Sequence, residues 1–309
     1  MNNRNRMYIV ASCFALALAV ATSAYDQPNV NLGFTSFMDG GPPAGAGWYY
    51  TQYAQFYTSD TFRDLDLPVQ PRLNAWVGLS QVIYQSEETV FGTARWGINL
   101  MLPYAYFDLN NRDLPLRANS GFGDLLVGPF LQWDPIMGER GPIFMHRVEF
   151  QTIWPTGDYD RKSAINPSSN VISLNPYWAA TWFAAPGATV SWRLHYLWND
   201  ENDRPNIPDP EVRDTQAGQA VHGNIAASYE IMPQQLRVGL NGYFFRQIEN
   251  SKANGTSVPD SKDQVYAMGP GAMWSFSPHA HLFFNYYREF EVENRTEGDR
   301  INLRYVQHF

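Results

Sequence analysis

Apolar and polar residues alternate along most of this chain. The pattern is clearest in residues 94–104, where Trp96 and Leu100 lie on one face and Arg95 and Asn99 on the other. Because successive side chains of a β-strand point to opposite faces, this spacing indicates a strand with one apolar and one polar face. A helix would instead repeat its apolar positions every three or four residues.

Twelve segments show this alternation or are rich in bulky apolar residues. They are residues 48–57, 73–84, 94–104, 123–133, 143–154, 174–184, 189–199, 217–231, 236–245, 265–276, 280–290 and 299–309. An even set of amphipathic strands is typical of membrane-spanning barrels, in which lipid-facing and interior residues alternate. The pattern predicts an all-β fold, a single transmembrane antiparallel β-barrel of about twelve strands over residues 48–309. Ten and fourteen strands are the alternatives.

The connectors between these segments alternate in length. Those after odd-numbered segments are polar and mostly long, as in residues 155–172, whereas residues 277–279 are one of the short links after even-numbered segments. Since outer-membrane barrels combine long external loops with short periplasmic turns, both termini of the chain are expected in the periplasm. Proline cannot donate to a strand ladder, so it predicts bulges or strand ends. Such interruptions are expected at Pro103, Pro129, Pro176 and Pro270.

The last segment ends on an aromatic residue, Phe309, after apolar positions at Ile301, Leu303 and Tyr305. It resembles the closing strand of bacterial outer-membrane proteins, which the barrel-assembly machinery reads. The resemblance implies this machinery as a partner through Phe309, with outer-membrane lipid and lipopolysaccharide around the barrel.

Residues 1–24 have the order of a secretory signal peptide. Arginines precede an apolar run at residues 7–21, and small residues follow up to Ala24. This order predicts export and cleavage after Ala24, with cleavage after Ala21 as the second choice. A lipoprotein site at Cys13 is the other interpretation, which the short apolar stretch before Cys13 disfavours.

Residues 25–47 lack a strand pattern and contain the sequence Gly40-Gly41-Pro42-Pro43-Ala44-Gly45. Glycine and proline interrupt both helices and strands. This stretch is therefore expected to be either a plug folded into the barrel mouth or a periplasmic tail. The two interpretations differ in whether it closes the lumen.

Composition narrows the function. The single cysteine lies in the predicted signal, so the 285 residues after it hold neither a disulfide nor a thiolate metal site. Without the two signal arginines, 20 basic residues face 30 acidic ones, a charge of −10 that disfavours nucleic acid as a partner. A mean hydropathy of −0.37 and the absence of an 18-residue apolar run exclude a helical membrane bundle. No cofactor and no metal site is predicted.

Counting by twos places a mixed set of side chains on the inner face. The predicted pore-lining residues are Arg95, Asn99, Asp124, Arg147, Glu149, Arg193, His195, His222, Asn224, Arg237, Asn241, Tyr243, Phe283, Asn285 and Tyr287. Further aromatic surface is expected from Phe122, Phe130, Tyr177, Phe183 and Phe245. A one-residue slip would turn four arginines toward lipid at about 2–4 kcal/mol each, which opposes any other register.

These inner residues suit an amphipathic solute. Aromatic rings could stack on the ring of a phenol or aromatic acid while its hydroxyl or carboxylate meets a guanidinium. The alternative is a filled lumen in which the arginines pair with carboxylates such as Glu149, Asp124 and Glu289.

Three motifs carry a family resemblance. They are Gly40-Gly41-Pro42-Pro43-Ala44-Gly45; Gly121-Phe122-Gly123-Asp124 with Gly128-Pro129 and Trp133; and Pro155-Thr156-Gly157-Asp158-Tyr159 with Asn166-Pro167 and Pro176. In these motifs the chain resembles the bacterial outer-membrane proteins of the MetA-pathway-of-phenol-degradation type, although Ala44 stands where that family suggests another proline. The resemblance spans nearly the whole mature chain and implies a channel for passive uptake of small hydrophobic or aromatic compounds.

Other functions are the alternatives. A structural or adhesion barrel with a closed lumen would show the same strand pattern. An outer-membrane lipid hydrolase would need a histidine followed two positions later by serine, and none of the six histidines meets this requirement. No catalytic residue is therefore predicted. The acidic residues 200–214 are interpreted as a solvated loop, with divalent ions that bridge lipopolysaccharide as the alternative.

Overall fold

Twelve long antiparallel strands close into one barrel, which confirms the predicted fold class. The computed structural model describes residues 30–42, 44–64, 70–110, 116–207 and 209–309, so the predicted signal peptide lies outside the described residues. The twelve strands are β1 (Gly47–Phe62), β2 (Arg72–Val90), β3 (Ala94–Asn110), β5 (Leu125–Trp133), β7 (Gly141–Glu149), β10 (Tyr177–Ala185), β11 (Ala188–Asn199), β13 (Ala220–Met232), β14 (Leu236–Gln247), β17 (Gln264–Ser277), β18 (Ala280–Glu293) and β19 (Thr296–His308).

Seven short strands complete the described secondary structure. The pieces that extend the barrel wall are β4 (Gly121–Phe122), β8 (Thr152–Trp154) and β9 (Ser173–Leu174), and β6 (Ile136–Gly138) pairs with β7. A separate three-stranded sheet in the connectors consists of β12 (Thr215–Gln216), β15 (Lys252–Ala253) and β16 (Thr256–Ser257). Within the described residues, no helix is long and apolar enough to cross a membrane.

Pairing of the first and last strands closes the barrel. β1 and β19 run antiparallel from Tyr49 opposite His308 to Phe62 opposite Thr296. Since closure removes the free edges of the sheet, the backbone groups of the wall are paired with neighbouring strands rather than left open to other chains.

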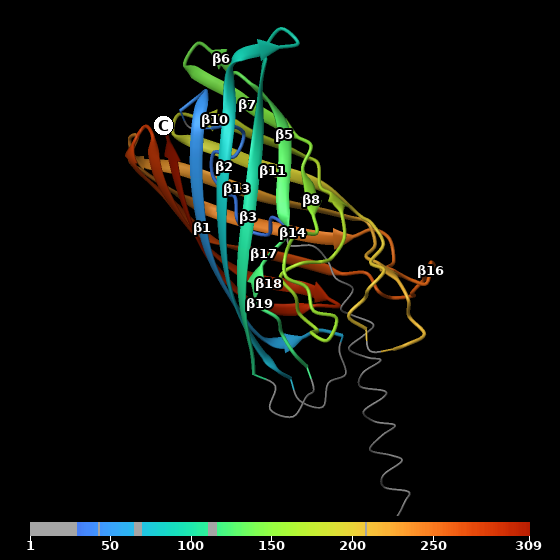
Figure 1. The fold of residues 1–309 in the computed structure, drawn as a ribbon. Coiled ribbons are helices and arrows are strands. Elements are labelled where there is room, and N and C mark those ends of the chain that lie inside the picture. Colours follow the sequence, from blue (N-terminus) through green and yellow to red (C-terminus); the bar gives the residue numbers. More distant parts are fainter. Residues whose placement is uncertain (1–29, 43, 65–69, 111–115, 208) are drawn as a thin grey trace, which may run out of the picture.

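The two ends of the barrel differ in their connectors (Figure 1). Short links such as residues 186–187 and 278–279 lie at the end that also holds the C-terminus, here called the turn end. Long connectors such as residues 155–172 lie at the opposite, loop end. The exception there is the two-residue link between β18 and β19, residues 294–295.

Alternating residues face out and in, as the sequence pattern predicts. On the outer face Leu100, Val148 and Ile225 are 43%, 43% and 50% exposed. On the inner face Asn99 and Glu149 are at most 1% exposed. Hydrocarbon around the wall favours this division, because a charged side chain on the lipid face is destabilising.

The inner position predicted for Phe122 was wrong, and so was the interruption predicted at three of the four prolines. Phe122 was expected on the inner face, but its ring is 54% exposed and packs edge-on against Tyr104 outside. The cause lies between β4 and β5, where Gly123 and Asp124 are both buried and shift the alternation by one residue. Pro176 does fall between β9 and β10, whereas the other three prolines lie inside continuous strands. Those three are Pro103 in β3, Pro129 in β5 and Pro270 in β17.

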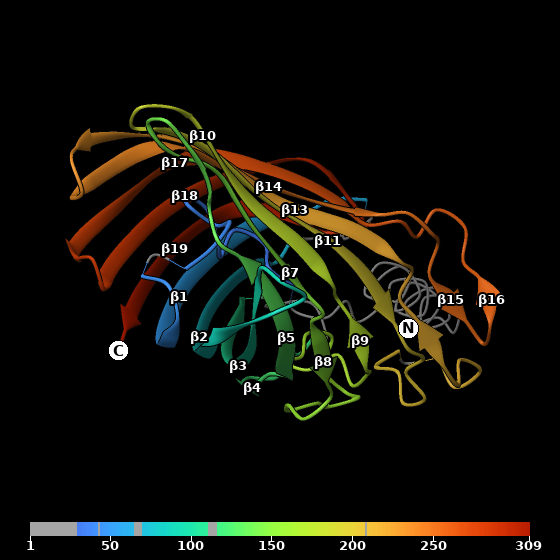
Figure 2. The same cartoon turned by 90° about the horizontal axis from the view of Figure 1, so that it is seen from above.

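The barrel encloses the chain that precedes β1. Residues 30–42, here called the lumen segment, run inside the wall (Figure 2). Leu32 belongs to a buried cluster with Tyr243 and Tyr287, and Phe37 to another that includes Phe283. The hydrophobic core of this protein therefore lies in the lumen, between the wall and this segment.

Candidate functional site in the barrel lumen

Most of the predicted pore-lining residues are buried. Thirteen of the fifteen are at most 9% exposed, namely Asn99, Asp124, Arg147, Glu149, Arg193, His195, His222, Asn224, Asn241, Tyr243, Phe283, Asn285 and Tyr287. The other two, Arg95 and Arg237, are partly buried. The structure brings many of the thirteen into contact with one another or with the lumen segment.

Arg95, Arg237 and Asp124 stand apart from this central group. The Arg95 Nε donates to Asp134 Oδ1 at 2.9 Å, and the Arg237 Nη1 donates to the Gly187 carbonyl at 3.0 Å. Asp124 accepts the Ser169 backbone N–H at 3.0 Å and thereby holds the connector of residues 155–172 against the wall. These contacts lie near the ends of the barrel, where they attach connectors to the wall.

Glu149 lies at the centre of a buried polar cluster. Its carboxylate accepts the Tyr177 hydroxyl at 2.6 Å and the Asn99 side-chain amide at 2.9 Å. The neighbouring Arg147 donates to Gln132 Oε1 at 3.0 Å and lies over the Phe130 ring. Charge-assisted hydrogen bonds of this kind compensate the removal of a carboxylate from water.

Glu289 forms a second cluster on β18. Its two oxygens accept the Tyr243 hydroxyl at 2.6 Å and the Tyr57 hydroxyl at 2.9 Å, and the Gly298 backbone N–H at 2.8 Å. The Arg300 Nη2 lies 3.5 Å from the same carboxylate. Four strands of the wall, β1, β14, β18 and β19, are thus joined through one buried anion.

A bidentate ion pair joins the lumen segment to the wall. The Arg193 Nε and Nη2 donate to the two oxygens of Asp39 at 2.8 and 2.7 Å, and both side chains are buried. The Arg193 guanidinium also lies over the Tyr177 ring, 4.2 Å from its centroid. This pair connects residues 154 positions apart and is the strongest polar attachment of the segment.

Further hydrogen bonds attach the segment to several strands. The Gly33 N–H donates to Asn224 Oδ1 at 2.8 Å, and the Gly40 N–H donates to Thr181 Oγ1 at 2.9 Å. Asn302 on β19 donates to the Gly33 carbonyl at 3.1 Å. β10 and β13 lie close together in the wall, with β11 between them, whereas β19 lies on another side of the barrel between β18 and β1. The bonds therefore hold the segment across the lumen.

Two histidines stack inside the wall. The rings of His195 and His222 are 4.2 Å apart and nearly parallel. The His222 Nε2 is 2.9 Å from Asn175 Oδ1. In the described part of the chain, no group of three or more His, Cys, Asp and Glu side chains is arranged to hold a metal ion, including residues 200–207 and 209–214 of the acidic loop.

Described residues line two cavities in the lumen. The larger, about 230 Å³, reaches toward the loop end and is lined by Asp263 and Arg295 among others. The smaller, about 90 Å³, reaches toward the turn end and is lined by Tyr49 and Val306 among others. Both touch Thr35, Tyr53 and Arg193. These three residues form the boundary between the two cavities.

One acidic side chain at the loop end has a shifted pKa. Burial raises the pKa of the Asp263 carboxyl to about 6, although the nearby Arg295 guanidinium opposes the shift. The Arg295 Nη1 lies 3.4 Å from Asp263 Oδ2. This pair adjoins the larger cavity.

Sequence reasoning missed the partners that the lumen segment supplies. Asp39 lies in a stretch without periodicity, so no pattern pointed to it. Arg300 and Arg304 did carry a signal, since both fall on the polar side of the terminal strand, and Arg304 lies over the Phe283 ring at 3.7 Å. The apolar face of β2 also turns inward at Leu73 and Leu79, where the lumen was expected to be polar.

The sequence matches one family, and the fold has solved counterparts. A sequence model of the family described as "Putative MetA-pathway of phenol degradation" matches residues 46–305. The structure of the COG4313 outer membrane channel from Pseudomonas putida F1 is similar, with a TM-score of 0.76 and 19% identity over 91% of this chain and 100% of that chain. At this identity the likeness shows a shared fold.

Other outer-membrane barrels are more distant. The NanC porin has a TM-score of 0.44 and 9% identity over 84% of this chain and 99% of that chain. The translocator domain of autotransporter NalP from Neisseria meningitidis has a TM-score of 0.46 and 11% identity over 86% and 89%. Among proteins with curated descriptions, none matches the sequence.

Proposed function

Because this chain belongs to the family described as "Putative MetA-pathway of phenol degradation", we propose that it is a channel for passive uptake of small hydrophobic or aromatic compounds. The family match confirms the resemblance predicted from the glycine- and proline-rich motifs. The closed twelve-strand barrel is an outer-membrane fold, and the outer membrane is accordingly its location.

The observation that carries the proposal is the composition of the larger cavity. Its wall combines aromatic side chains such as Phe34, Tyr57 and Phe107 with the guanidinium groups of Arg193 and Arg300. Aromatic faces bind a flat apolar solute, and guanidinium groups hold a polar substituent. Movement down a concentration gradient through such a lumen needs no cofactor and no catalytic group.

In this proposal the lumen segment is a plug and the loop end faces outward. The segment lies at the boundary between the two cavities, where Thr35 contacts both. A solute that enters from the loop end would reach the larger cavity first and would pass onward only when the segment is displaced. Both termini of the chain that forms the barrel would then lie in the periplasm.

Liposome swelling tests the proposal. The full chain and a variant that lacks residues 25–45 are reconstituted, and swelling is compared in sodium benzoate and in arabinose at pH 7.5, where the acid is ionised and crosses bare lipid slowly. We expect the variant to swell faster in benzoate than in the sugar, and the full chain to swell more slowly than the variant. Equal swelling rates in the two solutes would contradict the proposed selectivity. The absence of swelling with either protein would contradict the proposed channel function.

A closed structural or adhesion barrel is the second candidate. The buried Arg193–Asp39 pair favours it, because a segment held this firmly could close the lumen permanently. Single-channel recordings separate the two candidates. A channel gives conductance steps, at least in the variant that lacks residues 25–45, whereas a closed structural barrel gives none in either protein.

A further inference from the structure

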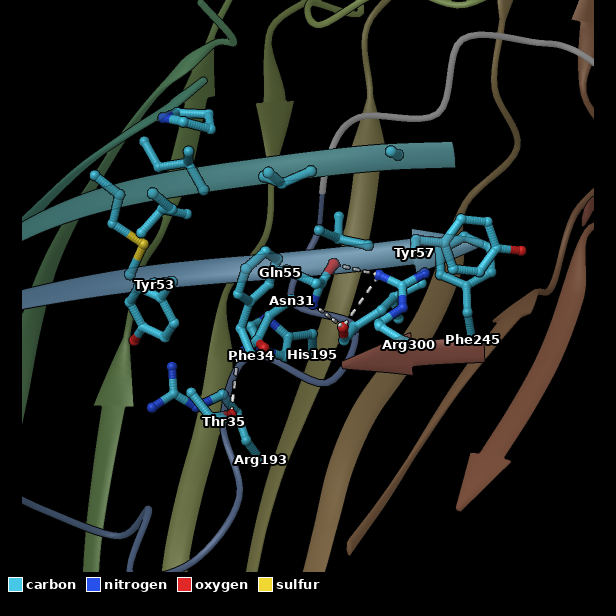
Figure 3. Close-up of a pocket in the computed structure, with 18 of the residues that line it drawn as sticks. Asn31, Phe34, Thr35, Tyr53, Gln55, Tyr57, Arg193, His195, Phe245 and Arg300 are labelled. Carbon is cyan, nitrogen blue, oxygen red and sulfur yellow. Dashed lines mark hydrogen bonds between the residues drawn. The ribbon is translucent and has the colours of Figure 1, made fainter. Parts of the chain in front are cut away.

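The larger cavity has room for a single ring. Its volume is about 230 Å³, and a protein cavity of about 150 Å³ is enough to hold benzene. A six-membered ring with one small substituent therefore fits, while a second fused ring would fill or exceed the space. Figure 3 shows the cavity between the lumen segment, with Asn31, Phe34 and Thr35, and the strands that carry Tyr57 and Arg300.

One side of this cavity is apolar. Leu73, Val77 and Leu79 line it from β2, and Met101 lines it from β3. The Phe34 ring adds an aromatic edge on the segment side, where it meets the Tyr53 ring at 5.4 Å and 88°. Burial of an apolar ring against such a surface is favourable at about 25 cal/mol per Å².

The facing side is cationic. Arg193, Arg295 and Arg300 line the cavity, and Asp263 is the single carboxylate among the lining residues that the structure describes. The Arg193 guanidinium is already held by two short bonds to Asp39, at 2.7 and 2.8 Å. The carboxylate contacts of Arg295 and Arg300 are longer, at 3.4 and 3.5 Å.

Arg300 is the best placed of these cations. Its Nη1 donates to Gln55 Oε1 at 2.7 Å, which holds the guanidinium beside the cavity, and its contact with Glu289 is at the limit of hydrogen bonding. Glu289 itself is satisfied by Tyr57, Tyr243 and the Gly298 N–H. An incoming carboxylate can therefore take donors from Arg300 without leaving Glu289 unpaired.

We propose that this cavity is a binding site for the anion of a monocyclic aromatic carboxylic acid. The ring lies against the β2 and β3 side chains, and the carboxylate faces Arg300 and Arg295. This inference rests on the proposed function and specifies its solute class, since the cationic side selects a carboxylate over an uncharged phenol. Because the site lies toward the loop end, it is the first site that a solute entering from that end would reach.

Equilibrium binding to the full chain tests the site. Calorimetric titrations of the detergent-solubilised protein at pH 7.5 use benzoate, phenol and acetate as probes. We expect saturable binding of benzoate, with phenol and acetate each at least about tenfold weaker, because each lacks either the charge or the ring.

Two variants locate the binding in this cavity. Arg300→Gln is expected to weaken benzoate binding about tenfold or more and to leave phenol binding unchanged. Arg288→Gln is the matched control, since Arg288 is 57% exposed and pairs with Asp299 outside the cavity, and it should bind benzoate as the parent does. Val77→Phe, which fills the space beside the ring, should weaken benzoate and phenol together.

The outcomes separate this site from the channel proposal. Equal affinity for benzoate and phenol, or an Arg300→Gln variant that binds benzoate normally, would overturn the carboxylate site. The liposome result would still decide the channel, since flux does not require saturable binding. Saturable benzoate binding without flux would instead support the binding site and contradict the channel function.

Discussion

The barrel wall and the lumen segment are held in place by different kinds of contact. In the wall, long strands such as β1 and β19 exchange backbone hydrogen bonds over most of their length. The lumen segment has no strand partner and is held by side chains, among them Arg193 and Asn224. A backbone ladder does not depend on which side chains it carries, whereas the segment depends on a few of them.

This difference implies that the segment can be released while the wall remains intact. The polar attachments of the segment come from side chains on several strands, among them Thr181 on β10, Arg193 on β11 and Asn302 on β19, so no cooperative backbone ladder protects it. The wall, by contrast, is closed and exposes no free edge. Three predictions test this contrast and a fourth concerns the loop end, in order of the expected size of their effects.

Asp39→Ala should release the segment. The substitution leaves Arg193 buried without its bidentate partner, which destabilises by about 3–5 kcal/mol. Hydrogen exchange of residues 30–42 should accelerate strongly, while the urea midpoint of the wall stays the same. Asp134→Ala is the control, since the exposed Arg95–Asp134 pair contributes about 0–1 kcal/mol. Unchanged exchange in Asp39→Ala would contradict side-chain attachment.

Leu100→Arg should act on the wall and leave the segment in place. Leu100 is 43% exposed on the outer face near the middle of β3, where an arginine at the bilayer centre costs about 2–4 kcal/mol. Reversible unfolding from phospholipid vesicles in urea measures the loss. Leu100→Met serves as the apolar control. An arginine variant as stable as the parent would mean that this face does not contact hydrocarbon.

Gly40→Ala should loosen the segment by a smaller amount. A Cβ at this position would lie 2.3 Å from the Thr181 nitrogen and 2.4 Å from the Met145 carbonyl oxygen, both backbone atoms of the wall. Because the wall cannot yield, the segment must move, at about 1–3 kcal/mol. Gly78→Ala is the control, since nothing lies within 4 Å of its added Cβ. Exchange rates of residues 30–42 should rise only in Gly40→Ala.

The smallest expected effect concerns the loop end and its pH dependence. Burial raises the pKa of Asp263 to about 6, so its folded state binds a proton more tightly than its unfolded state. Its contribution to stability is present below the unfolded pKa and is lost as the pH rises through about 6. Exchange of the amides around residues 263 and 295 should be faster at pH 7.5 than at pH 4.5 after correction for intrinsic rates, and Asp263→Asn should abolish the difference.

Some assignments failed because the wall departs from regular alternation. The inner position expected for Phe122 assumed one uninterrupted strand, but the gap after β4 shifted the count by one residue. The apolar face of β2 was visible in the sequence, yet its direction was not, since a strand with Trp76 on one side and Leu79 on the other gives no sign of which side meets lipid. That inward apolar face now forms one side of the larger cavity.

The sequence by itself determined the strands, their approximate number, the closed membrane barrel and the family. Hydrocarbon around the barrel imposes a period of two on every strand, and the family motifs can be read directly as short runs of residues. Only the tertiary structure decided that residues 30–42 lie in the lumen, that Asp39 meets Arg193 and that a one-ring cavity separates Leu79 from Arg300. These contacts join side chains far apart in the chain. They form because the wall closes around an irregular segment. The residues that this closure brings into contact show no periodic pattern in the sequence.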